Sequence, residues 1–266
     1  MKNNNLIQLP NNLEIAYIHQ YEAEYLYNEI FVQQTYLKHD IKLTNEMLVF
    51  DIGANIGMFS LYIKQMCPTA TIYAFEPSHT TFQVLNYNMN KYHLGSAFPW
   101  AVSDINGKKE FIHYSNSTVF SGLYTDKTLD EGRIKAIATN VVTNELKEEH
   151  SEIIKKYVDV LTQDRVQTIC ETVETKKLST LISDLNIKKI DLLKIDAEGS
   201  EFDILFNTDD RDWSKIKQIV LECHSNDERK YKKLLSLLKQ KQFSIMRENE
   251  TLLDKTGLIN LYCYKK

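Results

Sequence analysis

A turn rich in small residues follows an apolar run in VFDIGANIGMF, residues 49–59. Gly53, Asn55 and Gly57 are residue types that tolerate the backbone angles of a tight turn, and Asp51 precedes them. The turn lacks the Gly-Lys-Ser/Thr ending of a phosphate-binding loop, and its spacing is not the G-x-G-x-x-G of a dinucleotide site. Because a carboxylate at this strand end would repel a phosphate and attract a cation, Asp51 favours a ligand with an ammonium or sulfonium group.

A second carboxylate lies about 20 residues beyond the turn, where YAFEP places Glu76 and Pro77 at the end of the next apolar run. A carboxylate at that position can accept hydrogen bonds from both hydroxyls of a ribose. An adenosine with a cationic tail describes S-adenosylmethionine, which is therefore the predicted cofactor. Three residues at the end of the third apolar run, SAFPWAVS, are expected to line the adenine: Ala101, Val102 and Ser103.

An acidic cluster follows a later apolar run, in IDLLKIDAEGSEFDIL at residues 190–205. In an open α/β sheet, ligands bind at the carboxyl ends of the strands, so Asp196 and Glu198 are candidate site residues. We assign Glu201 instead to the first turn of a helix, where the helix dipole favours acidic residues.

Glu222 and His224 end the next apolar run, IVLECHS, two residues apart. In a regular strand, residues at this spacing share a face. Because an alcohol has a pKa far above 7, methyl transfer to it benefits from a positioned general base, typically by about 10²–10⁴ in rate. Histidine beside a carboxylate is a natural base, so the pair is a candidate catalytic unit.

The same side chains offer an alternative chemistry. Asp196, Glu198, Glu222 and His224 are competent ligands for a divalent metal. Their spacing matches no common metal motif, so we expect no metal.

Apolar runs typical of strands alternate with helical patterns from about residue 46 onward, which predicts crossover units and a mainly parallel α/β sheet. The chain ends in two candidate strands, FSIMRE and NLYCYKK, which are expected to form an antiparallel hairpin at the sheet edge.

Two segments stand apart from this alternation. An apolar stripe over residues 22–37 predicts a helix within an N-terminal extension, residues 1–45, that covers the pocket of the main domain, residues 46–266. Residues 126–166 are charged and helical in pattern, and we interpret them as an insertion between strands that acts as a lid.

The composition narrows the class of protein. The 266 residues carry 32 Lys plus Arg against 36 Asp plus Glu, a net charge of −4, so no basic field for nucleic acid or anionic lipid is expected. A polar start, and the lack of any run of about 18 apolar residues, predict a cytoplasmic protein without membrane spans. The four cysteines form no CxxC pair and are expected to be ordinary buried residues.

Several of these motifs occur together in one known family. VFDIGANIGMFSLY, YAFEPSHTTFQVLNYN, AVSDINGK and IDLLKIDAEGSEFDIL resemble the FkbM-type S-adenosylmethionine-dependent methyltransferases. This resemblance covers most of the chain from about residue 46, and it implies the Rossmann-like, seven-stranded class I fold.

A narrower resemblance concerns the substrate. LPNNLEIAYIHQYEAEYLYNEIF, YLKHDI, FSGLYTD, DWSKIKQIVLECHS and LLDKTGLINLY are similar to the O-methyltransferase domains of polyketide synthase and mixed nonribosomal peptide assembly lines. It implies O-methylation of a hydroxyl on an intermediate tethered to an acyl or peptidyl carrier protein, with a His/Glu base and no required metal. Those roles would fall on His224, with Glu222 or Glu198 as its partner.

Other activities stay open at this stage. No ketosynthase, carrier or docking region is visible, so an excised domain and a free-standing enzyme are both possible, and the latter could methylate a free small molecule or sugar. A nicotinamide-dependent oxidoreductase is disfavoured by Asp51 and by the missing third glycine. A non-catalytic protein that keeps the fold as an interaction surface is disfavoured by the Glu222/His224 pair.

Overall fold

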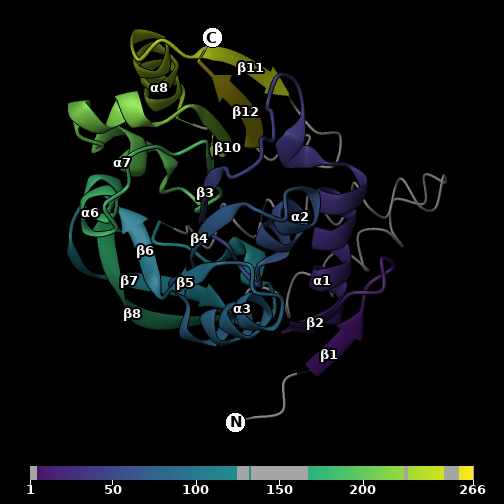
Figure 1. Cartoon of the computed structure of the whole chain (residues 1–266). Coiled ribbons are helices and arrows are strands. Elements are labelled where there is room, and N and C mark those ends of the chain that lie inside the picture. The colour runs from purple at the N-terminus through teal and green to yellow at the C-terminus, as the bar shows by residue number, and fades with distance from the viewer. Residues whose placement is uncertain (1–4, 125–131, 133–166, 225–226, 249–257, 266) are drawn as a thin grey trace, which may run out of the picture.

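A seven-stranded sheet forms the centre of the computed structural model (Figure 1). The structure describes residues 5–124, 132, 167–224, 227–248 and 258–265. The strand order across the sheet is β11-β12-β10-β9-β3-β4-β5. The strands in chain order are β3 Leu48–Ile52, β4 Thr71–Phe75, β5 Ser96–Phe98, β9 Leu192–Ile195, β10 Gln218–His224, β11 Ser244–Glu248 and β12 Leu258–Tyr264.

The pairing of these strands confirms the predicted fold class. Strands β10, β9, β3, β4 and β5 pair in parallel, so their carboxyl ends meet at one edge of the sheet. Strand β12 pairs antiparallel with both β10 and β11, as expected for the C-terminal hairpin.

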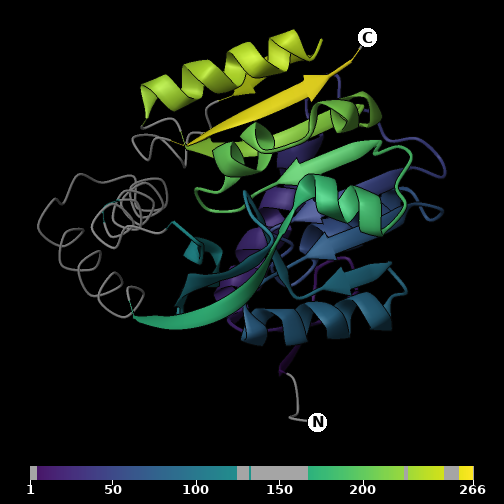
Figure 2. The same ribbon diagram turned by 90° about the vertical axis from the view of Figure 1, so that its left-hand side faces the viewer.

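Helices cover both faces of the sheet (Figure 1). Successive side chains of a strand point to opposite faces, and accordingly Val49 belongs to the apolar core under one helical layer and Phe50 to the core under the other. In the turned view of Figure 2, α8 lies along the C-terminal strands at one end of the molecule and α3 lies at the other end. The helices are α2 Met58–Met66 and α3 His79–Lys91 on the first face, and α6 Leu178–Asp184, α7 Glu201–Phe206 and α8 Glu228–Gln240 on the second, with the 3-10 helix η4 Asp210–Lys215.

Helix α8 illustrates how the local sequence sets these elements. The Asp227 side chain accepts hydrogen bonds from the backbone N–H groups of Arg229 and Lys230 and so caps the helix start. Tyr231, Leu234 and Leu238 recur at three- and four-residue spacing and are all buried. This apolar face of the helix therefore packs on the sheet.

A separate three-stranded sheet, β6-β8-β7, lies beside the central one. Its strands are β6 Trp100–Ser103, β7 Gly107–Tyr114 and β8 Thr168–Lys177. The run SAFPWAVS, expected to be a single strand, is divided at Pro99, which lacks a backbone N–H for the ladder. Residues 101–103 consequently leave the central sheet and lie on β6.

The N-terminal extension holds a β-hairpin, β1 Asn5–Gln8 and β2 Glu14–Tyr17, that the sequence patterns did not predict. The helix expected over residues 22–37 is divided into α1 Gln20–Tyr27, a π-helical turn η1 Asn28–Val32 and a 3-10 turn η2 Thr35–Leu37. The Asn88 amide of α3 bonds the backbone N–H of Ala16 at 2.8 Å and the carbonyls of Ala16 and Ile56 at 3.0 and 2.8 Å. One side chain thus ties the hairpin to the glycine-rich turn.

Three further expectations concern other parts of the chain. The predicted insertion, residues 126–166, lies outside the described residues apart from Gly132. Within the described ranges, no helix is long and apolar enough to cross a bilayer. Cys67, Cys223 and Cys263 are buried, whereas Cys170 on β8 is exposed, contrary to expectation.

Both glycines of the turn have a left-handed backbone, and Gly53 is also required by packing within the protein itself. Gly53 has φ +71°, and a Cβ added there would lie 1.7 Å from the backbone oxygen of Asp196. Gly57 has φ +90°, and its added Cβ would lie 2.9 Å from Leu85 Cδ1. The turn after β3 therefore rests directly on the chain that leaves β9.

Replacing Gly53 with Ala is predicted to lower the free energy of unfolding by more than about 3 kcal/mol, because a left-handed backbone and a backbone clash are combined. Gly107→Ala is the matched control, since Gly107 also has a positive φ, +156°, but an added Cβ meets nothing within 4 Å. Urea unfolding of the two variants measures the difference. Equal decreases in the free energy of unfolding would contradict the prediction, because they would show that the backbone at Asp196 moves aside at no energetic cost.

Candidate functional site

A cavity opens at the carboxyl edge of the central sheet and encloses ≈ 630 Å³ of empty space, counted out to its mouth. Most of the predicted site residues line it: Gly53, Asn55, Glu76, Pro77, Ala101, Val102, Asp196 and Glu198. The sequence analysis did not anticipate the other lining residues, which include Leu26 of α1, Trp100 and Phe111 of the small sheet, and the segment containing Thr118, Val119, Ser121 and Leu123.

Glu76 is held at one end of the cavity by backbone amides. Its Oε1 accepts a hydrogen bond from Ser78 N at 3.0 Å, and its Oε2 accepts one from Asn55 N at 3.1 Å. Asn55 has φ +46°, a left-handed conformation that asparagine tolerates. Burial raises the pKa of Glu76 to about 7, although these two hydrogen bonds act in the opposite direction.

Asp51 lies behind the cavity and is fully buried. Its Oδ2 accepts a hydrogen bond from Ser60 Oγ at 2.7 Å, and its Oδ1 lies 3.3 Å from Lys194 Nζ. The cation beside Asp51 is therefore a lysine of the protein, whereas the sequence argument placed a ligand cation there. Ser103 and Gly57 are likewise outside the set of described residues that line the cavity.

Lys194 of β9 is a buried residue that the sequence analysis missed. Its ammonium lies between Asp51 Oδ1 at 3.3 Å and Asp196 Oδ2 at 3.4 Å, and it donates a hydrogen bond to the Gly53 carbonyl at 2.8 Å. Burial by itself would lower the pKa of Lys194, but the two carboxylates outweigh it, so this pKa lies above its usual value. The role of Lys194 could not be recognised from the run LLKI, because its partners lie on another strand and in two loops.

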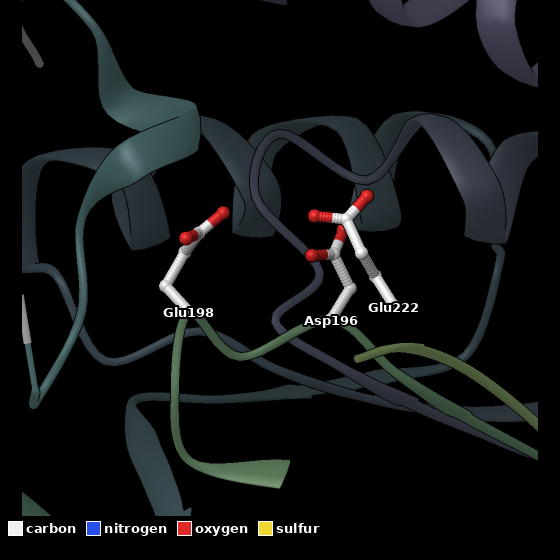
Figure 3. Close-up of side chains that lie close together, drawn as sticks. All are labelled: Asp196, Glu198 and Glu222. Atoms are coloured by element: carbon white, nitrogen blue, oxygen red, sulfur yellow. The ribbon is translucent and has the colours of Figure 1, made fainter. Parts of the chain in front are cut away.

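Three carboxylates lie close together at the other end of the cavity (Figure 3): Asp196 and Glu198 line it, whereas Glu222 is not among the lining residues. Oxygen atoms of Asp196, Glu198 and Glu222 all lie within 4.8 Å of one another. Glu198 has φ +38°, an uncommon backbone conformation of the kind that clusters at functional sites. The oxygens are close enough to share a divalent cation, which is the alternative chemistry that the sequence left open.

His224 is the last residue of β10, where its backbone pairs with Leu258 of β12. Its side chain lies outside the part of the chain that the structure describes. Glu222, its neighbour on the same strand, is 8% exposed. Their joint role as a base stays a prediction.

A hydrogen-bonded chain links the N-terminal extension to the glycine-rich turn. Asn55 Nδ2 donates to Thr118 Oγ1 at 3.2 Å, and Thr118 Oγ1 donates to Glu22 Oε2 at 2.9 Å. Burial raises the pKa of Glu22. Leu26, one turn later on α1, lines the cavity. The extension is therefore part of the cavity wall.

Comparisons with known proteins identify the family of the chain. The Methyltransferase FkbM domain family matches residues 51–245. The chain is 32% identical over 255 residues to the 31-O-demethyl-FK506 methyltransferase FkbM of Streptomyces tacrolimicus, covering 95% of this chain and 94% of that protein. It is 31% identical over 266 residues to the AMB antimetabolite synthetase AmbE of Pseudomonas aeruginosa, covering 97% of this chain but only 12% of that protein.

Solved structures resemble the chain more remotely. A chain of the fibrillarin/Nop5p complex superposes with a TM-score of 0.49 at 12% identity, covering 99% of this chain and 98% of that chain. The family assignment therefore depends on the sequence matches and on the strand order described above. The chain belongs to the FkbM methyltransferase family, and the protein is a methyltransferase with a Rossmann-like class I fold.

Proposed function

We propose that the protein transfers the methyl group of S-adenosylmethionine to a hydroxyl oxygen of a small natural-product acceptor. The observation that carries the proposal is that one cavity joins the Glu76 end to the Asp196/Glu198 end. A carboxylate suited to a ribose and a second acidic group therefore line the same cavity, so that one ligand can contact both.

The residues present fit this cofactor, whose use the family and fold imply. Each Glu76 oxygen accepts one backbone N–H and has a further lone pair for a ribose hydroxyl. Trp100, Ala101 and Val102 form an apolar wall that suits a flat adenine. Asp196 supplies a negative charge beside the glycine-rich turn, where a sulfonium would be attracted. When bound, S-adenosylmethionine supplies a methyl group that its sulfonium already activates for displacement.

The acidic end of the cavity favours a neutral hydroxyl over a carboxylic acid as the acceptor group. Asp196, Glu198 and Glu222 would repel an acceptor that carries a carboxylate or phosphate. His224 would take the proton of the hydroxyl, and Glu222 or Glu198 would orient its imidazole. The relative named as a 31-O-demethyl-FK506 methyltransferase supports an oxygen acceptor.

The acceptor is proposed to be a polyketide or nonribosomal peptide intermediate. The similarity to a short part of AmbE, which is named as an antimetabolite synthetase, supports a methyltransferase domain that works within a larger synthetase, and an acceptor tethered to a carrier protein is proposed for that case. The match over nearly all of FkbM supports equally a free-standing enzyme that acts on a released molecule. Mass spectrometry of hydroxylated intermediates, free and carrier-tethered, would detect the methyl gain and separate the two.

Calorimetric titration with S-adenosylhomocysteine and with NAD tests the cofactor. We expect binding of the first only, and preferential binding of NAD would favour an oxidoreductase. Cofactor binding without turnover on any hydroxylated acceptor would favour a non-catalytic role.

Replacing His224 with Ala should reduce the methyl-transfer rate by about 10²–10⁴-fold, because the acceptor proton loses its base. The affinity for S-adenosylhomocysteine should stay unchanged, since the change removes no predicted cofactor contact. His93→Asn, at an exposed left-handed turn after α3, is the control and should keep full activity. A fully active His224→Ala enzyme would remove the histidine from the mechanism.

Treatment with EDTA is predicted to leave the methyl-transfer rate unchanged, because the proposed base needs no metal. Initial rates before and after chelation and desalting measure this. Loss of activity that added Mg²⁺ restores would instead assign Asp196, Glu198 and Glu222 to a cation.

The affinity for S-adenosylhomocysteine should fall roughly tenfold between pH 8 and pH 6, because Glu76, with a pKa of about 7, becomes protonated, and one of its two oxygens then carries a proton and no longer accepts from a ribose hydroxyl as a carboxylate oxygen does. The ionised form, which binds, predominates above pH 7, so the affinity rises with pH. In Glu76→Gln the affinity should be low and nearly independent of pH. Glu228→Gln, on the exposed start of α8, should keep the wild-type profile; a flat wild-type profile would contradict the role of Glu76.

A further inference from the structure

A tyrosine from the N-terminal extension reaches the acidic end of the cavity. Tyr36, in the 3-10 turn η2, donates a hydrogen bond from its hydroxyl to Asp196 Oδ2 at 2.9 Å. Tyr36 is not among the residues that line the cavity, whereas Asp196 is. The hydrogen bond to Asp196 thus connects the Tyr36 hydroxyl to the cavity wall.

The surrounding structure fixes where this hydroxyl lies. Tyr36 is 3% exposed, and its ring packs edge-on against Phe59 of α2 with the centroids 5.4 Å apart. The Tyr262 hydroxyl of β12 donates to the carbonyl of Thr35 at 2.5 Å. Contacts to α2 and to the C-terminal hairpin thus hold the turn from two sides.

The charge around Tyr36 keeps its hydroxyl a donor. Burial, and then the charges of Asp196, Glu29 and Glu222, raise the pKa of Tyr36 well above its usual value of 10.0. The hydroxyl therefore stays protonated at any pH at which the protein would be assayed.

Two donors act on the same oxygen of Asp196. Its Oδ2 accepts from Tyr36 and lies 3.4 Å from Lys194 Nζ. The two contacts hold Oδ2 in place and so restrict the rotation of the carboxylate. Removing the tyrosine hydroxyl would leave Oδ2 with the longer of these two contacts, to Lys194.

We propose that Tyr36 is a positioning residue that sets the orientation of the Asp196 carboxylate toward the sulfonium of bound S-adenosylmethionine. The inference rests on the proposed function, because it takes Asp196 to face the charged end of that cofactor. It gives the segment YLKHDI, which the sequence analysis singled out only by resemblance, a chemical role.

The test compares a charged with an uncharged ligand. S-adenosylmethionine carries the sulfonium and S-adenosylhomocysteine does not, so a misdirected carboxylate weakens binding of the first selectively. Tyr36→Phe keeps the ring and removes only the hydroxyl. We expect calorimetry to show an affinity for S-adenosylmethionine about tenfold lower, as for a lost hydrogen bond to a charged group, with little change for S-adenosylhomocysteine.

A double-mutant cycle with Asp196→Asn separates positioning from a general structural effect. Asp196→Asn alone should show the selective loss, and adding Tyr36→Phe should cause no further loss. Tyr92→Phe is the matched control, since its hydroxyl is also hydrogen-bonded, to the Glu14 carbonyl at 2.7 Å, but neither Tyr92 nor Glu14 is among the residues that line the cavity. It should change neither affinity.

Other outcomes would overturn the inference. Equal losses for both ligands, the same loss from Tyr36→Phe in both backgrounds, or no selective loss in Asp196→Asn would each remove the positioning role while leaving the proposed function intact. A wild-type protein that binds neither ligand would instead overturn the proposed function, and the inference with it. Thermal unfolding of every variant shows whether it is folded.

Discussion

The ammonium of Lys194, buried in the centre of the sheet, is the constraint on which the site depends. It lies between Asp51 and Asp196 and donates to the Gly53 carbonyl. Because an unpaired charge in the interior costs several kcal/mol, each of these groups needs the others, and breaking such a pair typically costs about 3–5 kcal/mol. The turn after β3 and the loop after β9 are thereby held against each other, and the closest contact is made where only a glycine, Gly53, leaves room.

This ion-pair network decides which carboxylates a ligand meets. Asp51 forms an ion pair with Lys194, accepts a hydrogen bond from Ser60 and does not line the cavity. The acidic residues that line it, among those the structure describes, are Glu76, Asp196 and Glu198. Their surroundings differ. Glu76 is buried, accepts hydrogen bonds from two backbone N–H groups and has a pKa of about 7, so its charge changes near neutral pH. Asp196 lies beside the ammonium of Lys194. Two carboxylates of the same sheet edge are thus suited to two parts of one ligand.

The N-terminal extension completes a site that the central sheet leaves open. Leu26 lines the cavity, Glu22 bonds Thr118, and Tyr36 bonds Asp196. The carboxyl edge of a parallel sheet is exposed unless other elements cover it, and in this protein elements that precede the first parallel strand do so. The family motifs therefore contain the lining residues at the ends of the parallel strands, and less regular segments of the chain supply other lining residues.

Periodicity and turn residues are local signals, so the amino-acid sequence was enough to predict the alternation of strands and helices, the antiparallel ending and most of the cavity-lining residues at the strand ends, from Gly53 to Glu198. The resemblance of its motifs was enough to predict the family. It could not place Asp51 behind the cavity, divide the third run at Pro99 between two sheets, or find Lys194, Thr118 and Tyr36. Lys194, Thr118 and Tyr36 contact Asp51, Asn55 and Asp196, respectively, which lie 63 to 160 positions away in the chain, and a buried charge is recognisable only when its partner is known. Tertiary structure alone brought these partners together.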